Sequence, residues 1–323
     1  MHQSSYALTP AQLQANGRIG KLKVIWGNKR LLGPDKCYLL IAFLLIIIPS
    51  IWFMWSQLPM YGDIMLILLT ETIFLVSTFI NWYSLYSVGT SDPGVIPAST
   101  SKVNTRYEYF IEPRKAGIGI IKLKVCHSWN IIRPPRSFHC HKCNWCIEVQ
   151  DHHWPWTGTW IGRRTHVKFI LFLISTSIHA LVAVILNIYP FILTKKEDPE
   201  DIFMLNSVMW MGFAGSFVIW MFWFAIYHLF LASQNITTNE SVRGVYKRDP
   251  NPFDYGLSTN MRIFSQIYPN TPSSIFDTLL ETSHNEEECY YRILTRYGKL
   301  FMREARKIKF TSTQDNEESK SFL

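Results

Sequence analysis

Four long apolar stretches alternate with polar segments along the chain, and this alternation is the strongest pattern in the sequence. The stretches run roughly over 37–58, 64–88, 167–193 and 203–232, with Trp or Tyr near the ends of the last two. Each can cross a hydrocarbon core of about 30 Å at a rise of about 1.5 Å per residue, and aromatic rings favour the membrane interface. The pattern therefore predicts an all-α membrane protein with four transmembrane helices.

Lysine and arginine residues are distributed unevenly among the polar segments. The segment before residue 37 carries six of them and the turn 59–63 carries none, while 89–166 is again basic. Basic segments resist translocation, so both termini and the 89–166 loop are expected on the cytosolic side. The net charge of +8 is also compatible with nucleic acid, but basic residues that flank membrane helices usually follow this rule and meet anionic lipid. We therefore expect a multi-pass protein in contact with the lipid bilayer and no nucleic-acid partner.

The same pattern divides the chain into six segments. A cytosolic N-terminal segment precedes the first pair of membrane helices, and a cytosolic domain rich in cysteine separates this pair from the second. A cytosolic C-terminal region follows, and it ends in a short polar tail that is expected to be disordered. In this order, the segments are 1–36, 37–88, 89–166, 167–232, 233–310 and 311–323.

The middle loop contains a cluster of cysteine and histidine residues with the spacing of metal ligands. Cys140 and Cys143 form a C-x2-C pair, and Cys146 repeats the interval. Zinc suits such ligands and takes four of them in structural sites, and a reducing cytosol disfavours disulfides. Reduced cysteines packed as small apolar side chains are the alternative, but packing does not explain the spacing. The candidate ligands are Cys126, His139, Cys140, Cys143, Cys146 and His153.

This segment resembles the cysteine-rich domain of the Asp-His-His-Cys (DHHC) protein S-acyltransferases. That domain has the form C-x2-C-x9-H-C-x2-C-x2-C-x4-D-H-H-C-x5-C, usually with R-P-x-R before the central histidine. The chain matches it at the family's intervals with Cys126, Arg133-Pro134-Pro135-Arg136, His139-Cys140, Cys143, Cys146 and Asp151-His152-His153.

Motifs outside this domain extend the resemblance over about 24–265. Asp92-Pro93-Gly94 is similar to the family's DPG motif, and Thr237-Thr238-Asn239-Glu240 to its TTxE motif. Asn251-Pro252-Phe253 is similar to its C-terminal Asn-Pro-aromatic element. Gly33-Pro34-Asp35 and Pro155-Trp156-Thr157-Gly158 resemble most closely the branch of the yeast Ras acyltransferase and many plant members.

The resemblance implies acyl transfer in two stages through a cysteine at position 154, which is Trp154 here. That cysteine takes a fatty acyl group, most often palmitoyl, from acyl-CoA and passes it to membrane-proximal cysteines of cytosolic proteins. His152 takes the thiol proton and Asp151 orients His152, as in catalytic triads. Relatives in the resembled branch sometimes work with an accessory subunit, which makes one a candidate partner.

Two structural zinc ions are a further implication of the resemblance. Their expected role is to fix the backbone so that position 154 lies at the mouth of the helix bundle. The first ion would be held by Cys126, His139, Cys146 and position 129, which is Trp129, and the second by Cys140, Cys143, His153 and position 160, which is Trp160.

Five other residues receive candidate roles. Arg133 and Arg136 are candidates for binding the CoA phosphates, although the topology rule explains basic residues equally well. Thr238 and Glu240 resemble residues that brace the active-site aspartate and nearby backbone, with helix capping as the alternative. Asn251 resembles a buried amide that satisfies backbone groups, and a simple turn signal is the alternative.

Tryptophan at positions 129, 154 and 160 conflicts with the chemistry of the family. Indole offers no basic lone pair to zinc and cannot form a thioester. One cause acting three times explains the pattern better than three separate substitutions. We therefore hypothesise that UGA codons read as cysteine in the source organism were recorded as tryptophan, and the high count of 12 tryptophans agrees with this hypothesis.

Two other functions are compatible with parts of the sequence. A catalytically inactive DHHC-like membrane scaffold is favoured by the tryptophans, whereas the intact Asp151-His152-His153 run argues against long decay. A transporter or channel needs polar residues that converge at mid-membrane, and the candidates are scattered. The sequence leaves endoplasmic reticulum, Golgi and plasma membrane open as locations. The ionisable residues inside the predicted spans are Glu71, His179 and His228.

Overall fold

A computed structural model of the protein describes most of the chain between residues 21 and 265. The C-terminal region after 265 is described only at one short strand, so most of 233–310 beyond that residue and nearly all of the expected disordered tail lie outside the described residues. The described residues are 21–25, 30–56, 61–96, 107–111, 121–129, 131–196, 201–265 and 308–312.

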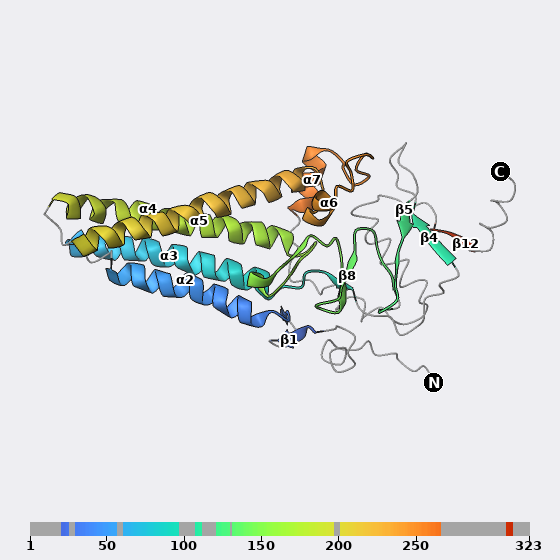
Figure 1. Ribbon diagram of the computed structural model, residues 1–323, viewed down its shortest axis with the longest axis horizontal. Coiled ribbons are helices and arrows are strands. Elements are labelled where there is room, and N and C mark those ends of the chain that lie inside the picture. The colour runs from blue at the N-terminus through green and yellow to red at the C-terminus, as the bar shows by residue number, and fades with distance from the viewer. Residues whose placement is uncertain are drawn as a thin grey trace, which may run out of the picture.

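Four long helices run side by side and form one end of the molecule (Figure 1). They are α2 (Lys36–Ser56), α3 (Ile64–Gly89), α4 (His166–Lys196) and α5 (Asp201–Ser233). All four are long and apolar enough to cross a membrane, which confirms the prediction of four transmembrane helices. Half of the apolar window of α4 is buried inside the protein, against 22% for α2 and α3, so α4 is the best-covered helix of the bundle.

Polar side chains on the helices bond across the bundle interior instead of facing lipid. Asn81 of α3 accepts a hydrogen bond from the Thr176 hydroxyl of α4 at 2.8 Å, and Asn187 of α4 donates to the carbonyl of Ser207 of α5 at 2.7 Å. Such bonds satisfy groups that hydrocarbon would leave without partners. They fix the bundle that carries the cysteine-rich domain.

The cysteine-rich domain, between α3 and α4, is built from short antiparallel β ribbons. This differs from an all-α fold, because runs of two or three residues between metal-ligand positions are too short to form helices or to show a strand period. The domain contains β3 (Val95–Ile96), β6 (Val125–Cys126), β7 (Ile131–Ile132), β8 (Phe138–Cys140), β9 (Trp145–Ile147), β10 (His152–Trp154), the 3-10 turn η2 (Pro155–Thr157) and β11 (Thr159–Ile161), and β1 (Lys23–Ile25) pairs with β2 (Arg30–Leu32) before α2.

A second small sheet lies apart from the helices at the far end of the molecule (Figure 1). It joins β4 (Tyr107–Ile111), β5 (Ile121–Leu123) and β12 (Ile308–Ser312), with β4 in the middle. The first two residues of the tail expected to be disordered, Thr311 and Ser312, pair with Glu108 and Tyr107 in this sheet. The paired strand therefore extends past the expected boundary at 311.

The start of α2 is fastened to the cysteine-rich domain by a close backbone approach. The amide of Asp35 donates to the carbonyl of Gly158 at 3.3 Å, and a Cβ on Gly33 would lie 2.0 Å from that same oxygen. Gly158 itself has φ +74°, a conformation that favours glycine. Glycine at 33 and 158 thus lets the first membrane helix begin against the turn that follows residue 154.

Two short helices follow α5 at the end of the bundle near the cysteine-rich domain (Figure 1). They are α6 (Thr238–Arg243) and α7 (Leu257–Phe264). Thr237 caps α6 with a full capping box, in which Glu240 bonds back to the backbone of Thr237. This cap places the start of α6 beside the Asp151-His152 segment, because the amide of Asn239 donates to the carbonyl of Asp151 at 3.2 Å.

Candidate active site and metal centres

Asp151 and His152 form a buried, hydrogen-bonded pair at the start of β10. The Asp151 Oδ2 atom lies 2.5 Å from His152 Nδ1, and the side chain of Asp151 is 1% exposed. Thr238 holds the same carboxylate with its amide, 2.7 Å from Oδ1, and its hydroxyl, 2.8 Å from Oδ2. The bond to Nδ1 assigns the proton to that nitrogen and leaves Nε2 with a lone pair.

The second ring nitrogen of His152 has a different environment. His152 Nε2 is buried and has no hydrogen-bond partner among the residues that the structure describes. The ring of Trp154 lies edge-on to the His152 ring, with 5.7 Å between centroids. An imidazole that is fixed by a carboxylate at one nitrogen and unbonded at the other has the arrangement of a general base.

The electrostatics of Asp151 suit an orienting role. Burial alone would raise its pKa, but the imidazoles of His166, His152 and His228 and the hydrogen bond with His152 lower the pKa well below the ordinary value of 3.8. The carboxylate therefore stays ionised and stabilises an imidazolium when His152 takes a proton.

Trp154 lies where the cysteine-rich domain meets the helix bundle. Its ring packs against Phe169 of α4 at 5.7 Å and Phe224 of α5 at 5.4 Å between centroids. It also lines an apolar cavity of about 300 Å³ between the membrane helices. Residue 154 therefore stands between the Asp151-His152 pair and a space that suits a hydrocarbon chain. Ala42 and Ile46 of α2, Phe172 of α4, and Phe217 and Met221 of α5 also line this cavity.

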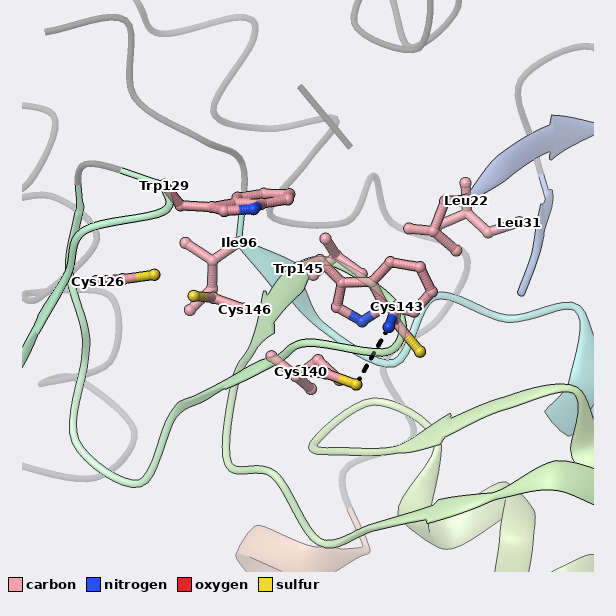
Figure 2. Packing of buried hydrophobic residues seen from close by; sticks show 11 residues of the cluster. Leu22, Leu31, Ile96, Cys126, Trp129, Cys140, Cys143, Trp145 and Cys146 are labelled. Carbon is pink, nitrogen blue, oxygen red and sulfur yellow. Dashed lines mark hydrogen bonds between the residues drawn. The ribbon is translucent and has the colours of Figure 1, made fainter. Parts of the chain in front are cut away.

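The first set of expected zinc ligands comes together in the structure. His139 of β8 lies opposite Cys146 of β9 in register, and His139 Nδ1 is 3.5 Å from Cys126 Sγ and 3.6 Å from Cys146 Sγ. All three ligand atoms lie within 4.8 Å of one another, a spacing that fits a zinc ion bound at about 2.3 Å from sulfur. Figure 2 shows the two sulfur atoms directed toward one another beside Trp129.

Trp129 occupies the fourth side of this first set. Its side chain is 3% exposed, and its ring lies edge-on to His139 with 6.3 Å between centroids. Burial raises the pKa of the Cys146 thiol, so a thiolate there needs a nearby cation. The three donors fit zinc, whereas the indole supplies no fourth donor.

The second set of expected ligands is less compact. Cys143 Sγ lies 3.8 Å from His153 Nδ1, and the amide of Cys143 donates to Cys140 Sγ at 3.3 Å. The hydrogen bond from Cys143 lowers the pKa of Cys140 to about 5 against the effect of burial, which favours a thiolate ligand. Within the described part of the chain, these three do not form a group as tight as the first set.

The indole of Trp160 occupies the place of the missing fourth ligand in this second set. Trp160 Nε1 donates to Cys143 Sγ at 3.2 Å, and its ring lies 5.0 Å from the His153 ring. Register in the β10–β11 ribbon places Trp160 directly opposite His153. A cysteine at 160 would direct a sulfur atom toward the same point.

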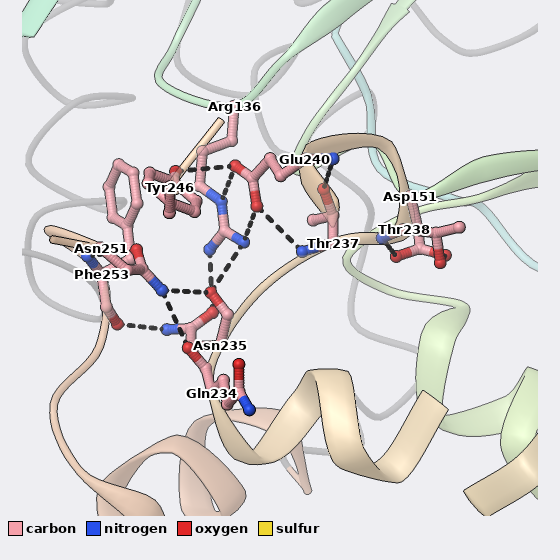
Figure 3. Close-up of polar contacts among 10 residues, drawn as sticks. All are labelled: Arg136, Asp151, Gln234, Asn235, Thr237, Thr238, Glu240, Tyr246, Asn251 and Phe253. Carbon is pink, nitrogen blue, oxygen red and sulfur yellow. Dashed lines mark hydrogen bonds and ion pairs between the residues drawn. The ribbon is translucent and has the colours of Figure 1, made fainter. Parts of the chain in front are cut away.

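Arg136 and Glu240 form a buried ion pair that joins the cysteine-rich domain to the segment after α5 (Figure 3). Arg136 donates from Nε and Nη2 to the two carboxylate oxygens of Glu240 at 2.8 and 2.7 Å, and from Nη1 to Asn235 Oδ1 at 2.8 Å. The side chains of Arg136 and Glu240 are 4% and 8% exposed. Arg136 is therefore committed to this pair, and its position argues against the expected contact with CoA phosphates.

The remaining candidate residues lie in the same region. Glu240 both caps α6 and pairs with Arg136, so the capping and bracing interpretations hold together. Asn251 donates to the carbonyls of Gln234 and Asn235 at 2.8 and 3.1 Å and accepts from the Phe253 amide at 2.9 Å, which is a backbone-satisfying role. Arg133 lies near the Phe138 ring, 5.8 Å from its centroid.

Three residues at the site were not found from the sequence. His166 Nε2 lies 3.1 Å from His228 Nδ1, and His228 Nδ1 lies 3.9 Å from Asp151 Oδ2, beyond hydrogen-bond distance. The ligand atoms of these two histidines and Asp151 all lie within 4.8 Å of one another, which is a metal-like spacing. Asp35 Oδ2 lies 2.5 Å from His153 Nε2. His228 was noted in a predicted span and Asp35 in the Gly33-Pro34-Asp35 motif, but nothing in the sequence placed either residue, or His166, beside the Asp151-His152-His153 run.

Comparisons with known proteins agree with this geometry. Residues 120–245 match the model of the DHHC palmitoyltransferase family. Palmitoyltransferase ZDHHC8 of Drosophila melanogaster is 35% identical over 186 residues, which cover 56% of this chain and 20% of that protein. Probable protein S-acyltransferase 1 of Arabidopsis thaliana is 27% identical over 281 residues, covering 77% and 81%. Palmitoyltransferase ZDHHC9 of Homo sapiens is 32% identical over 202 residues, covering 51% and 52%.

These relatives come from animals and plants alike, so the matches do not single out a branch of the family. The chain spans a fifth to about half the length of the two animal relatives and most of the plant one. The matched region contains the cysteine cluster, the Asp151-His152 pair, and α4, α5 and α6. These matches identify residues 120–245 as a DHHC palmitoyltransferase domain.

Proposed function

We propose that this protein is a membrane-bound protein S-acyltransferase that transfers a fatty acyl group, palmitoyl in the first instance, from acyl-CoA to cysteines of cytosolic proteins. The observation that carries the proposal is the buried Asp151-His152 pair, in which Nε2 of His152 has no hydrogen-bond partner among the described residues and the ring lies 5.7 Å from that of Trp154, a residue that lines the apolar cavity. The proposal requires a cysteine at position 154 in the living cell.

The reaction follows from these positions in two balanced steps. His152 Nε2 takes the thiol proton of residue 154, and the resulting thiolate attacks the acyl-CoA carbonyl; the carbon–sulfur bond to CoA breaks, and the departing CoA thiolate takes the proton from His152. In the second step, His152 deprotonates the thiol of a substrate protein, which attacks the enzyme thioester. The thiol of residue 154 leaves and recovers its proton from His152.

Binding of the two parts of acyl-CoA uses different regions of the protein. The apolar cavity between α2, α4 and α5 accepts the acyl chain, because burial of hydrocarbon contributes about 0.8 kcal/mol per CH₂ group. Arg133 is the remaining candidate for the CoA phosphates, since its Nε atom is buried with no hydrogen-bond partner among the described residues. Arg136 is left out of this role because Glu240 and Asn235 occupy its guanidinium group.

Zinc at both cysteine–histidine sets is part of the same proposal. When bound, zinc supplies no acid–base step and holds the short ribbons together. Cys126, His139 and Cys146 fit one ion, and Cys140, Cys143 and His153 fit another, with a donor from position 129 or 160 completing each site. The bond from the Trp160 indole to Cys143 Sγ supports the view that a fourth ligand belongs at position 160.

The proposal is tested with a triple-cysteine form that carries Trp129→Cys, Trp154→Cys and Trp160→Cys. Purified in detergent and incubated with palmitoyl-CoA, this form is expected to give a hydroxylamine-sensitive thioester at position 154. The matched control carries Trp129→Cys and Trp160→Cys only; it retains both zinc sites and forms no thioester. A triple-cysteine form that binds zinc and folds but never becomes acylated would overturn the proposal.

The residue inserted at position 154 is tested separately. Peptide mass spectrometry of the natively expressed protein is expected to give cysteine masses at positions 129, 154 and 160. Tryptophan masses at these positions would leave the inactive membrane scaffold as the function of the natural chain. The intact hydrogen-bonded support of His152 by Asp151 and Thr238 argues against that alternative.

Topology and partners complete the proposal. Both termini and the cysteine-rich domain lie on the cytosolic side, where acyl-CoA and the protein substrates are found, and the substrates present cysteines close to the membrane surface. The compartment is an endomembrane, endoplasmic reticulum or Golgi, or the plasma membrane. Epitope tags at each end, probed before and after selective permeabilisation of the plasma membrane, test this orientation.

A further inference from the structure

Asp35 lies outside the cysteine-rich domain, immediately before α2, and yet its side chain contacts the second set of zinc ligands. Asp35 Oδ2 is 2.5 Å from His153 Nε2, and the other nitrogen of the same ring, Nδ1, is 3.8 Å from Cys143 Sγ. The side chains of Asp35 and His153 are 10% and 15% exposed. The imidazole therefore faces a carboxylate on one edge and a sulfur ligand on the other.

The backbone holds Asp35 in this place independently of its side chain. Its amide donates to the carbonyl of Gly158, and the close approach of Gly33 to Gly158 leaves no room for a side chain at 33. Its carbonyl accepts from the amides of Tyr38 and Leu39 in the first turn of α2 at 3.0 and 3.2 Å. The first membrane helix therefore presents the carboxylate to His153 from a fixed starting point.

We infer that Asp35 is a positioning residue for the second zinc site. Its carboxylate accepts a hydrogen bond from the protonated Nε2 of His153. The lone pair of Nδ1 is then directed at the metal. A carboxylate that is hydrogen-bonded to the ring nitrogen away from the metal orients a zinc-bound histidine and raises its basicity. His153 directly precedes residue 154, so Asp35 also ties the first membrane helix to the position of the nucleophile. The inference rests on the zinc binding and acyl transfer proposed above.

An ion pair with Lys142 is a simpler reason for an aspartate at position 35, since Lys142 Nζ lies 3.0 Å from Asp35 Oδ1. The side chain of Lys142 is 57% exposed, and ion pairs of exposed side chains contribute little. The Asp35–His153 contact is the buried one of the two. Lys142→Met therefore serves as a matched control that removes the ion pair and keeps the contact with His153.

The test measures zinc loss from the full-length triple-cysteine form in detergent. Transfer of zinc to a chromogenic chelator is followed over time, with Cys126→Ser marking the release phase of the first site and Cys143→Ser that of the second. Asp35→Ala is expected to accelerate release from the second site by about 10–100-fold, the usual loss when such a carboxylate is removed, and to leave the first phase unchanged. Asp35→Asn should fall between, because its amide oxygen still accepts the hydrogen bond but carries no charge; Lys142→Met should behave as the parent.

Two results would overturn the inference. Asp35→Ala could release zinc from the second site at the parent rate, or it could accelerate both phases equally, which indicates general loosening of the fold. If Asp35→Ala does not fold, Asp35→Asn is judged by the same criterion of selective acceleration. Because release is measured without acyl-CoA, a chain that forms no thioester can still show the effect of Asp35, and an active chain can lack it.

Discussion

The buried pair of Arg136 and Glu240 makes the stability of the cysteine-rich domain and the segment after α5 sensitive to a single substitution. Glu240 accepts both bonds of the guanidinium fork, the amide of Thr237 at 2.9 Å and the hydroxyl of Tyr246 at 3.1 Å. Glu240→Ala leaves Arg136 buried and charged with one side-chain acceptor, Asn235 Oδ1. Removal of one partner from a buried pair costs about 3–5 kcal/mol, and we expect a loss of that size in the free energy of unfolding.

A double-mutant cycle separates this effect from the loss of the α6 cap. The cycle consists of Glu240→Leu, Arg136→Met and the two together, and the double variant replaces both charges with apolar groups of similar size, which is often close to neutral. The lost α6 cap, about 1 kcal/mol, and the lost hydrogen bond of the Tyr246 hydroxyl should remain as costs. The double variant should therefore be more stable than Glu240→Leu alone, which like Glu240→Ala leaves Arg136 without its carboxylate partner.

The assay is unfolding by denaturant in detergent, followed through the reactivity of the cysteine thiols after zinc has been removed from all samples alike. Thr238→Val, which lies beside the pair and keeps both charges, is the matched comparison. A cost below about 1 kcal/mol for Glu240→Ala, as for an exposed ion pair, would contradict the reasoning, and so would strictly additive costs in the cycle.

Three further predictions follow from the site. Thr238→Val removes the hydroxyl donor to Asp151 but keeps the amide donor. Thioester formation in the triple-cysteine form should therefore slow by about tenfold, which corresponds to about 1.4 kcal/mol in the activation free energy, while zinc content stays unchanged. An unaffected rate would show that the hydroxyl does not matter. The pKa of Glu240 lies below its ordinary value of 4.5, since Arg136 and the hydrogen bonds to Glu240 outweigh burial. The stability that Glu240 contributes is therefore present above pH 4.5 and is lost as the pH falls through its lower pKa in the folded protein. Glu240→Gln should flatten this acid dependence in unfolding measured from pH 7 down to pH 3. Met221→Trp fills part of the apolar cavity and should shorten the preferred acyl chain in competition between acyl-CoA species, and an unchanged preference would place the chain elsewhere.

The membrane helices could be predicted closely from the sequence because their signal is local. Apolar runs of the required length set the expected spans, and α2 and α3 begin and end within about two residues of the expected bounds. Asp63, whose side chain accepts from the Leu66 amide at 2.9 Å, explains why the second span begins where it does. Composition alone is enough for such elements, since lipid imposes one structure on them.

Contacts between distant segments could not be predicted in the same way. Arg136 was expected to bind phosphate because it is basic and lies in a motif, but its partner Glu240 is 104 positions away. Asp35 and His153 are 118 positions apart, and neither spacing nor periodicity connects them. The strands of the cysteine-rich domain also escaped prediction, because their two or three residues are held by ligand geometry and neighbouring turns instead of a hydrophobic period.

Three parts of the chain meet at residue 154, and each supplies a different kind of support. The helix bundle provides the apolar cavity, the segment after α5 holds Asp151 through Thr238, and the residue before α2 contacts His153. Each histidine of the Asp151-His152-His153 run contacts its own carboxylate, His152 that of Asp151 and His153 that of Asp35. In the proposed mechanism, the first contact orients the base and the second orients a metal ligand. A cysteine-rich domain without the segments that flank the membrane helices would keep the ligands but lose both the Thr238 and the Asp35 contacts, so the proposed activity needs the membrane part of the chain as more than an anchor.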